Sequence, residues 1–186
     1  GDRNYLGSTV GFLEDIGALQ PWASFAHAIW LSDEEVETFA AHDAVAVHNP
    51  VSNLKLGAGV APVPALLHAG AKVAIGADGA SSNDTQNMFE TLKMSAIVHR
   101  VMNPQDRWPR AVDALGMCWS GGADAMRQPL GRIAPGCAGD LVVLERDTYG
   151  ASAPDQIANQ LVYAELGGCV DTVVVGPPAL GLPLPE

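Results

Sequence analysis

The stretch 44-AVAVHNPVSNLKLGAGVAPVPALLHAGAKVAIGAD-78 decides the fold. It contains two short apolar runs, 44-AVAVH-48 and 72-KVAIG-76, whose length and composition predict strands. Between them, 62-PVPALLHAG-70 starts with proline and stops with glycine, which predicts a short helix after an irregular loop over 49–59. Continuous apolar strands separated by helices are typical of a parallel sheet covered on both faces, so the stretch predicts an α/β fold.

The same pattern continues on both sides of this stretch. Upstream, 23-ASFAHAIW-30 predicts a third buried strand, and Ser32 with Glu35 predicts a capping box at the start of a helix over 33–43. Downstream, the apolar spacing within 86–102 predicts a helix. Together these segments make three βα units.

The remaining segments are less regularly spaced. Helices are predicted over 5–19, 109–117, 121–128 and 154–165, and strands within 131–145 and over 169–175.

Composition excludes several classes of function. A chain of 186 residues with 48% hydrophobic residues can bury one sizeable core, and its net charge of −11 argues against a nucleic-acid partner. No apolar run approaches the roughly 18 residues of a membrane span, so we expect a cytoplasmic protein without a membrane partner. The three cysteines are odd in number and lack CxxC spacing, which indicates neither a disulfide framework nor a cysteine zinc site.

Three polar residues stand at the ends of the three predicted strands. His27, His48 and Asp78 each follow an apolar run, and catalytic groups of parallel sheets and barrels gather at this edge. Each residue taken alone has a structural explanation, as a hydrogen-bonded histidine or a turn-forming aspartate, but their common position favours one shared site. Imidazole and carboxylate groups suit a divalent ion such as Zn²⁺ and also suit general acid–base catalysis without metal. The residues alone leave both possibilities open.

Three runs resemble a known family. The runs 26-AHAIWLSDEE-35, 48-HNPVSNLKLGAGVAPV-63 and 75-IGADGASSN-83 are similar to the metal-dependent amidohydrolase superfamily, in its cytosine-deaminase-like branch of aminohydrolases and chlorohydrolases. That branch includes deaminases of S-adenosylhomocysteine, methylthioadenosine, guanine and 8-oxoguanine, together with triazine hydrolases. The resemblance covers roughly residues 5 to 175.

The resemblance implies a specific architecture. Residues 1–130 would form part of a (β/α)₈ TIM-type barrel, with the three strands as strands six, seven and eight and their following helices. Residues 131–186 would supply strands of a small β-sandwich with a connecting helix.

The resemblance also implies roles for individual residues. Asp78 would ligate the metal and take a proton from the attacking water, and His27 would orient that water or the developing tetrahedral centre. The metal would be one divalent ion, zinc in the first place and iron as the alternative. Five further residues match positions near the substrate: Trp30, His48, Ser52, Asn53 and Ser82.

The implied reaction is hydrolysis of a carbon–nitrogen bond that is not a peptide bond. A hydroxide on the metal would attack a ring carbon of an N-heterocycle of purine, pyrimidine or triazine type. Deamination is the first expectation, and the residues do not separate it from dechlorination or ring-amide hydrolysis.

The sequence departs from the family in its metal ligands. It has no His-x-His pair and no His followed three residues later by Glu, which supply most of the family's site. We therefore expect the C-terminal portion of a longer protein, with most metal ligands on the N-terminal half of the barrel and no turnover by the isolated chain. That half is the expected partner, and an exposed barrel seam could also favour a homo-oligomer.

A second hypothesis needs no catalysis. A non-catalytic α/β module could use the segments 76–83 and 49–59 to bind a small molecule or a partner chain. Upstream sequence carrying the missing histidine motifs would distinguish the two hypotheses.

Overall fold

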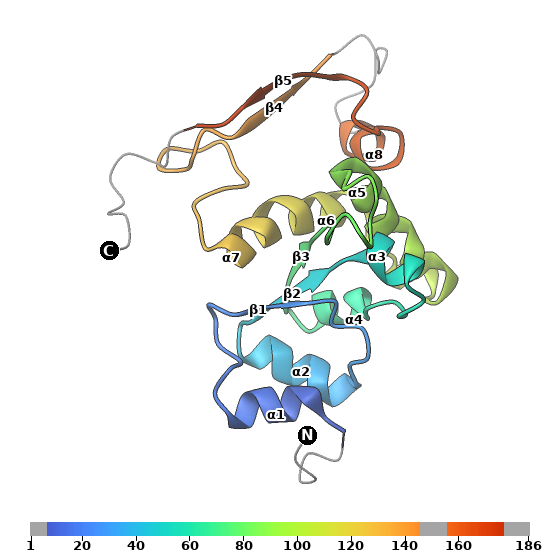
Figure 1. Cartoon of the computed structure of the whole chain (residues 1–186), viewed down its shortest axis with the longest axis vertical. Helices are drawn as coiled ribbons and strands as arrows, with labels where there is room; N and C mark the ends of the chain where they lie inside the picture. Colours follow the sequence, from blue (N-terminus) through green and yellow to red (C-terminus); the bar gives the residue numbers. More distant parts are fainter. Residues whose placement is uncertain (1–6, 146–155, 177–186) are drawn as a thin grey trace.

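Three short parallel strands lie at the centre of the chain (Figure 1), within residues 7–145 and 156–176, which the computed structural model describes. They are β1 (Ser24–Ala26), β2 (Val45–His48) and β3 (Lys72–Ile75), paired in that order. The helices are α1 (Thr9–Asp15), α2 (Asp33–Ala41), α3 (Pro50–Lys55), α4 (Val63–His68), α5 (Met88–Ile97), α6 (Ala111–Gly116), α7 (Gly122–Met126) and α8 (Ile157–Tyr163). The α/β class and the parallel sheet predicted from the sequence are confirmed.

Shorter helical turns and a second sheet complete the fold. The 3₁₀ turns are η2 (Val98–Val101) and η3 (Gln105–Arg107), and the π-helical turn η4 (Met117–Gly121) joins α6 to α7. The strands β4 (Leu141–Leu144) and β5 (Val170–Val174) form an antiparallel pair that stands apart from the parallel sheet in Figure 1. The first residues of the helix predicted over 5–19 lie outside the described ranges. None of the described helices has the length and apolar character that a bilayer crossing requires.

The prediction for the first strand was wrong in length and burial. The sequence predicted a buried strand over 23–30, but β1 has only three residues and alternates between exposed and half-buried positions. The strand stops because His27 and Ala28 have φ angles of 75° and 45°, in the left-handed region, which ends the extended backbone. As an outer strand of the sheet, β1 is covered less well than β2.

Two local predictions had opposite outcomes. The capping box at α2 is confirmed, because Ser32 Oγ accepts from the Glu35 N–H at 3.2 Å and Glu35 Oε2 accepts from the Ser32 N–H at 2.9 Å. The irregular loop predicted over 49–59 was wrong in its first half, which forms α3 with Pro50 at its first position. Six residues are too few to give a helical period, although proline at a helix start was a usable signal.

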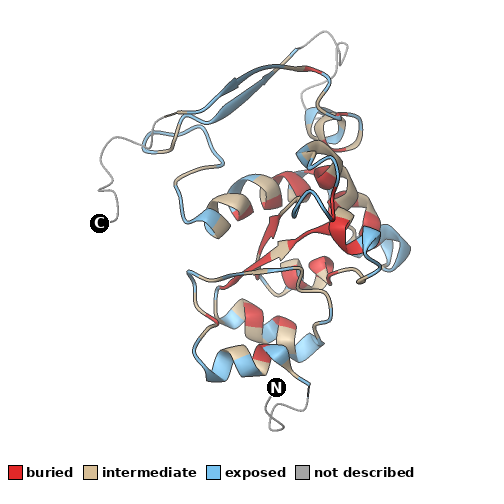
Figure 2. Cartoon of the chain, in the orientation of Figure 1, coloured by how far each residue is buried: buried red, intermediate tan, exposed pale blue. Residues whose placement is uncertain are grey.

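The core surrounds the parallel sheet. Figure 2 shows buried residues concentrated on β2, β3 and the helix faces turned toward them, with α1 and α2 on one side and α5 and α6 on the other. Among the largest fully buried apolar side chains are Leu19, Phe39, Val45, Val63, Leu66 and Val162. This packing holds the carboxyl ends of the strands in fixed positions.

Gly121 at the end of η4 permits a close approach of this helical turn to β3. A Cβ atom at this position would collide with the Val73 carbonyl oxygen and lie 3.0 Å from Ala74 Cα, both on the β3 backbone. We expect Gly121→Ala to lower the free energy of unfolding by about 2 kcal/mol or more, because a strand backbone cannot yield as a side chain can.

The neighbouring Gly122 provides the matched control. A Cβ atom there meets nothing within 4 Å, so Gly122→Ala should be neutral or slightly stabilising, as alanine usually is in a helix. Urea unfolding of both variants measures the difference, and equal effects would contradict this account of η4.

Candidate functional site

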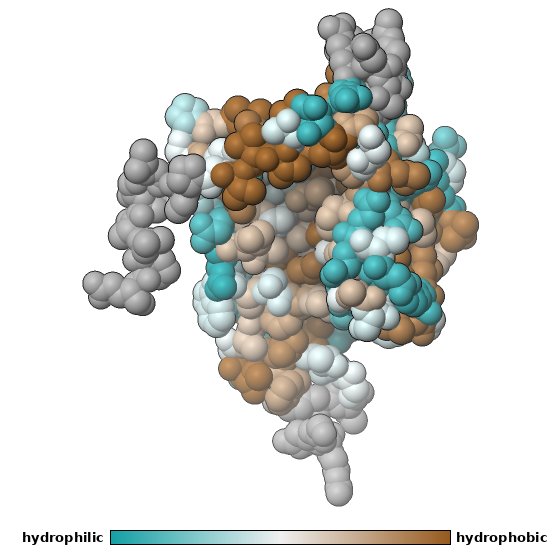
Figure 3. Space-filling model, turned by 45° about the horizontal axis from the view of Figure 1, so that its top comes forward, coloured by the Kyte–Doolittle hydropathy of each residue, from teal (hydrophilic) through white to brown (hydrophobic). Residues whose placement is uncertain are grey.

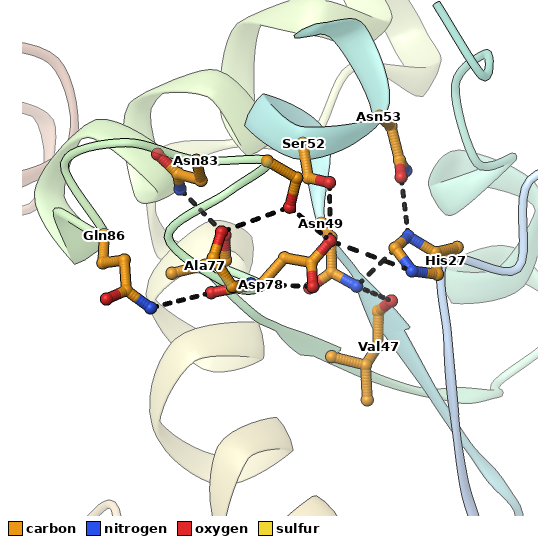
Figure 4. A network of polar contacts seen from close by, with 11 residues as sticks. His27, Val47, Asn49, Ser52, Asn53, Ala77, Asp78, Asn83 and Gln86 are labelled. Atoms are coloured by element: carbon orange, nitrogen blue, oxygen red, sulfur yellow. Dashed lines mark hydrogen bonds and ion pairs between the residues drawn. The ribbon is translucent and has the colours of Figure 1, made fainter. Parts of the chain in front are cut away.

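The two predicted catalytic side chains meet at the carboxyl edge of the sheet. His27 directly follows β1, and Asp78 lies three residues beyond β3. The His27 Nε2 atom is 3.9 Å from Asp78 Oδ2, and the two side chains are 41% and 32% exposed (Figure 4). The structure therefore brings these two groups together at a site open to solvent.

The Asp78 carboxylate accepts three hydrogen bonds. Ser52 Oγ donates to Oδ2 at 2.5 Å, Ser82 Oγ donates to the same oxygen at 3.0 Å, and the Gly79 N–H donates to Oδ1 at 2.8 Å. These bonds hold the pKa of Asp78 below its ordinary value, with the Ser52 bond as the largest cause. The carboxylate is therefore ionised at neutral pH.

The backbone at Asp78 is held in an unusual conformation. Its φ angle of 65° lies in the left-handed region, which costs a non-glycine residue about 1–3 kcal/mol. Asn83 Nδ2 donates to the Ala77 carbonyl at 2.9 Å, and Gln86 Nε2 donates to the Asp78 carbonyl at 3.0 Å. Sequence reasoning missed both residues, although their position in the polar loop between β3 and α5 was an available signal.

His27 is held from α3 and from the end of β2. Its Nδ1 atom lies 2.8 Å from Asn53 Oδ1 and 3.5 Å from Asn49 Nδ2, and its backbone N–H donates to the Val47 carbonyl at 2.8 Å. With a φ of 75°, His27 shares the left-handed conformation of Asp78. Both candidate catalytic residues thus depend on neighbours that stabilise a costly backbone.

Asn49 was also missed by sequence reasoning. Its side chain occupies the space beside Gly76, where a Cβ atom would collide with Asn49 Oδ1 and lie 3.0 Å from Val47 Cγ1. Gly76 at the end of β3 therefore admits the asparagine that reaches toward His27.

The five residues predicted to lie near the substrate occupy three kinds of position. Ser52 and Ser82 contact Asp78, Asn53 contacts His27, and all three are buried. Trp30 is 82% exposed, with its ring beside Gly59. Their assignment as substrate contacts stays a prediction.

His48 lies in the core. It is 1% exposed, and its ring lies against that of His99 with the ring centroids 5.2 Å apart. None of the four ring nitrogens has a hydrogen-bond partner in the described part of the chain. Burial, followed by the neighbouring His99, lowers the pKa of His48 to about 3, so its imidazole is neutral at pH 7. Its predicted role at the substrate also stays a prediction.

The described residues can supply only part of a metal site. Within residues 7–145 and 156–176, no three His, Cys, Asp or Glu side chains are grouped so that they could hold an ion. The ionised, partly exposed carboxylate of Asp78 is a suitable oxygen ligand for a divalent ion. A site built on Asp78 needs further ligands from outside these residues.

Removal of the Ser52 hydroxyl should change the acidity of Asp78. We expect Ser52→Ala to raise the pKa of Asp78 toward the ordinary aspartate value, because it removes the largest cause that lowers this pKa. A carboxyl ¹³C NMR titration measures the shift. Ser81→Ala, an exposed neighbour in the same loop, should leave the titration unchanged, and identical curves for all three proteins would contradict the assignment.

Comparison with known proteins gives consistent matches. The model of the amidohydrolase family matches residues 1–177. The chain is 40% identical over 159 residues to a 5-methylthioadenosine/S-adenosylhomocysteine deaminase of Nitratidesulfovibrio vulgaris, covering 85% of this chain and 36% of the relative. It is 37% identical over 171 residues to a 5′-deoxyadenosine deaminase of Methanocaldococcus jannaschii, covering 92% and 39%.

Solved structures agree with these sequence matches. A zinc-bound adenosine deaminase from Xanthomonas campestris superposes with a TM-score of 0.84 at 28% identity, covering 92% of this chain and 40% of that one. A zinc-bound atrazine chlorohydrolase from Arthrobacter aurescens has a TM-score of 0.83 at 30% identity, covering 94% and 39%. The chain thus spans about two fifths of the length of the proteins it matches.

Proposed function

The chain belongs to the amidohydrolase family, and we propose that it forms part of a zinc-dependent hydrolase that deaminates an N-heterocycle. The observation that carries the proposal is the approach of His27 Nε2 to Asp78 Oδ2, 3.9 Å apart at the carboxyl edge of the sheet. A non-catalytic binding module is not favoured, because the matched relatives are named as deaminases.

Each residue contributes a definite step to this chemistry. A bound divalent ion would supply positive charge that lowers the pKa of a water molecule to about 7. Asp78, ionised and held by Ser52 and Ser82, would serve as one ligand and take the proton of the attacking water. His27, held by Asn53, would bind and orient the water or the reacting centre.

The overall change is a balanced hydrolysis. Water adds to the ring carbon that carries the amino group, its oxygen stays on that carbon, and a proton passes to the leaving nitrogen. Asp78 is placed to carry that proton, and the nitrogen departs as ammonia. Trp30, a residue that is 82% exposed, offers a flat apolar face for a purine, pyrimidine or triazine ring.

The finer architecture is part of the same proposal. We place β1, β2 and β3 in a (β/α)₈ barrel formed by residues 1–130, and β4 and β5 in a small β-sandwich formed by residues 131–186. Within the described residues, β1 and β3 each pair on one side only, which is consistent with strands that continue into a closed barrel. The partner would be the remaining part of that barrel, with the other metal ligands.

A chimera tests the proposed function. Residues 7–176 would replace the matching segment of the Nitratidesulfovibrio vulgaris deaminase, which is 40% identical to this chain. We expect the chimera to bind zinc and to release ammonia from methylthioadenosine or a related heterocycle, whereas the 186-residue chain alone releases none. A folded, zinc-loaded chimera that deaminates no purine, pyrimidine or triazine would refute the proposal.

A further inference from the structure

Asn53 is a buried side chain that contacts the ring of His27. It lies within α3, it is 2% exposed, and its Oδ1 atom is 2.8 Å from His27 Nδ1 (Figure 4). Its backbone is fixed at both ends, because its N–H donates to the Asn49 carbonyl at 3.0 Å and its carbonyl accepts from the Ala58 N–H at 2.9 Å. These bonds fix the backbone from which the Asn53 side chain reaches the ring of His27.

The chemistry of this contact determines where His27 carries its hydrogen. An amide oxygen has no hydrogen and can only accept, so the ring must donate from Nδ1. The other neighbour of Nδ1, the Asn49 amide nitrogen at 3.5 Å, lies equally 3.5 Å from the Val47 carbonyl and can donate there instead. In a neutral ring with a hydrogen on Nδ1, Nε2 has the lone pair.

We propose that Asn53 is a positioning residue that holds His27 as the Nδ1–H tautomer, so that Nε2 faces the site as a hydrogen acceptor. The inference rests on the proposed function for its catalytic meaning. With 2% of its surface exposed, Asn53 acts on the site through the ring of His27.

In this tautomer, His27 and Asp78 each present a hydrogen-bond acceptor to the site. Nε2 of His27 and Oδ2 of the ionised Asp78 are 3.9 Å apart, and two acceptors cannot hydrogen-bond to each other. A molecule that contacts both must donate two hydrogens, which water and a departing amino group or ammonia can do. The tautomer therefore fits the chemistry of deamination on both the attacking and the leaving side.

Nitrogen NMR of the 186-residue chain tests the tautomer directly. In histidine labelled with ¹⁵N, the ring nitrogen shifts at about pH 8 report which nitrogen carries the hydrogen, and a His27→Gln sample assigns the signals. We expect His27 to be Nδ1–H in the wild-type chain. Asn53→Leu, which removes the acceptor, should shift His27 toward the Nε2–H form, whereas Asn53→Asp, which keeps an acceptor oxygen, should retain Nδ1–H.

Asn103→Leu is the matched control. The Asn103 amide donates to the His99 carbonyl at 3.0 Å, so its loss should leave the His27 signals unchanged. An Nε2–H His27 in the wild-type chain would overturn the inference, since Asn53 would then be turned over and donating. A folded Asn53→Leu variant that keeps Nδ1–H would overturn it as well.

Neither result depends on turnover. If Asn53→Leu does not fold, the wild-type and Asn53→Asp spectra still decide the tautomer. An inactive chimera would refute the proposed function without changing the NMR result, so the two failures can be told apart.

Discussion

Asp78→Asn in the chimera is expected to reduce ammonia release about 10³-fold or more. The amide has nearly the same shape as the carboxylate but has no charge and cannot accept the proton of the attacking water. In the aspartate, Oδ2 accepts hydrogen bonds from both Ser52 and Ser82. The amide has only one acceptor oxygen in place of the two carboxylate oxygens. We expect kcat to fall while the chimera stays folded, and zinc content to fall with the loss of one ligand.

A second aspartate provides the control for this substitution. Asp106 lies in η3, outside the Asp78 network, so Asp106→Asn should leave kcat within about twofold of the unsubstituted chimera. Ammonia release and zinc content measured on the same samples separate lost chemistry from lost metal. A near-normal rate in Asp78→Asn would remove Asp78 from the catalytic role.

Acidification is expected to destabilise the chain before its carboxylates titrate. The buried imidazoles of His48 and His99 have pKa values of about 3 and about 4 in the folded chain, against 6.5 for an ordinary histidine, and burial is the main cause in both. As the pH falls, the unfolded chain therefore binds these two protons at a higher pH than the folded chain does. The stability contributed by the two neutral rings is complete above about pH 6.5 and is lost as the pH falls toward 4 and then 3.

The expected loss is large for a domain of this size. A pKa difference of one unit corresponds to about 1.4 kcal/mol, so each histidine should cost on the order of 3 kcal/mol at pH 4 relative to pH 7. Urea unfolding of the 186-residue chain at a series of pH values measures it.

Replacement of one ring isolates the histidine contribution. His99→Leu should remove about half of the loss between pH 6.5 and 4. It should cost little at pH 7, because neither ring nitrogen of His99 has a hydrogen-bond partner among residues 7–145 and 156–176. His68→Leu, at an exposed position in α4, should leave the pH dependence unchanged. Identical pH profiles in wild type and His99→Leu would contradict the role of the buried pair.

The sequence predicted the βα order well because that order depends on local apolar patterning. The runs at β2 and β3 and the capping box at α2 are each strong local signals, and they were confirmed. The sequence did not predict where β1 stops, because the left-handed turn at His27 is imposed by contacts to β2 and α3 rather than by local propensity. Helix α3 was missed for a related reason. Its six residues are too few to show a helical period in the sequence.

From the sequence, only the common position of the candidate catalytic residues at the ends of parallel strands could be predicted. Parallel strands bring His27 and Asp78 to one edge, and that much follows from chain order. The supporting contacts of Asn49, Asn83 and Gln86 depend on side-chain directions that no spacing rule specifies. The burial of His48 against His99 likewise depends on the path of the chain after α5.

The left-handed backbone at positions 27 and 78 has a consequence for saturation mutagenesis of this chain. Asparagine and glycine adopt that conformation at little cost, whereas valine and isoleucine strongly resist it. A library at either position would therefore contain two classes of inactive clone, one abundant and properly folded and one depleted at the level of expression. Only the first class reports on chemistry, so abundance and activity should be scored separately at these two positions.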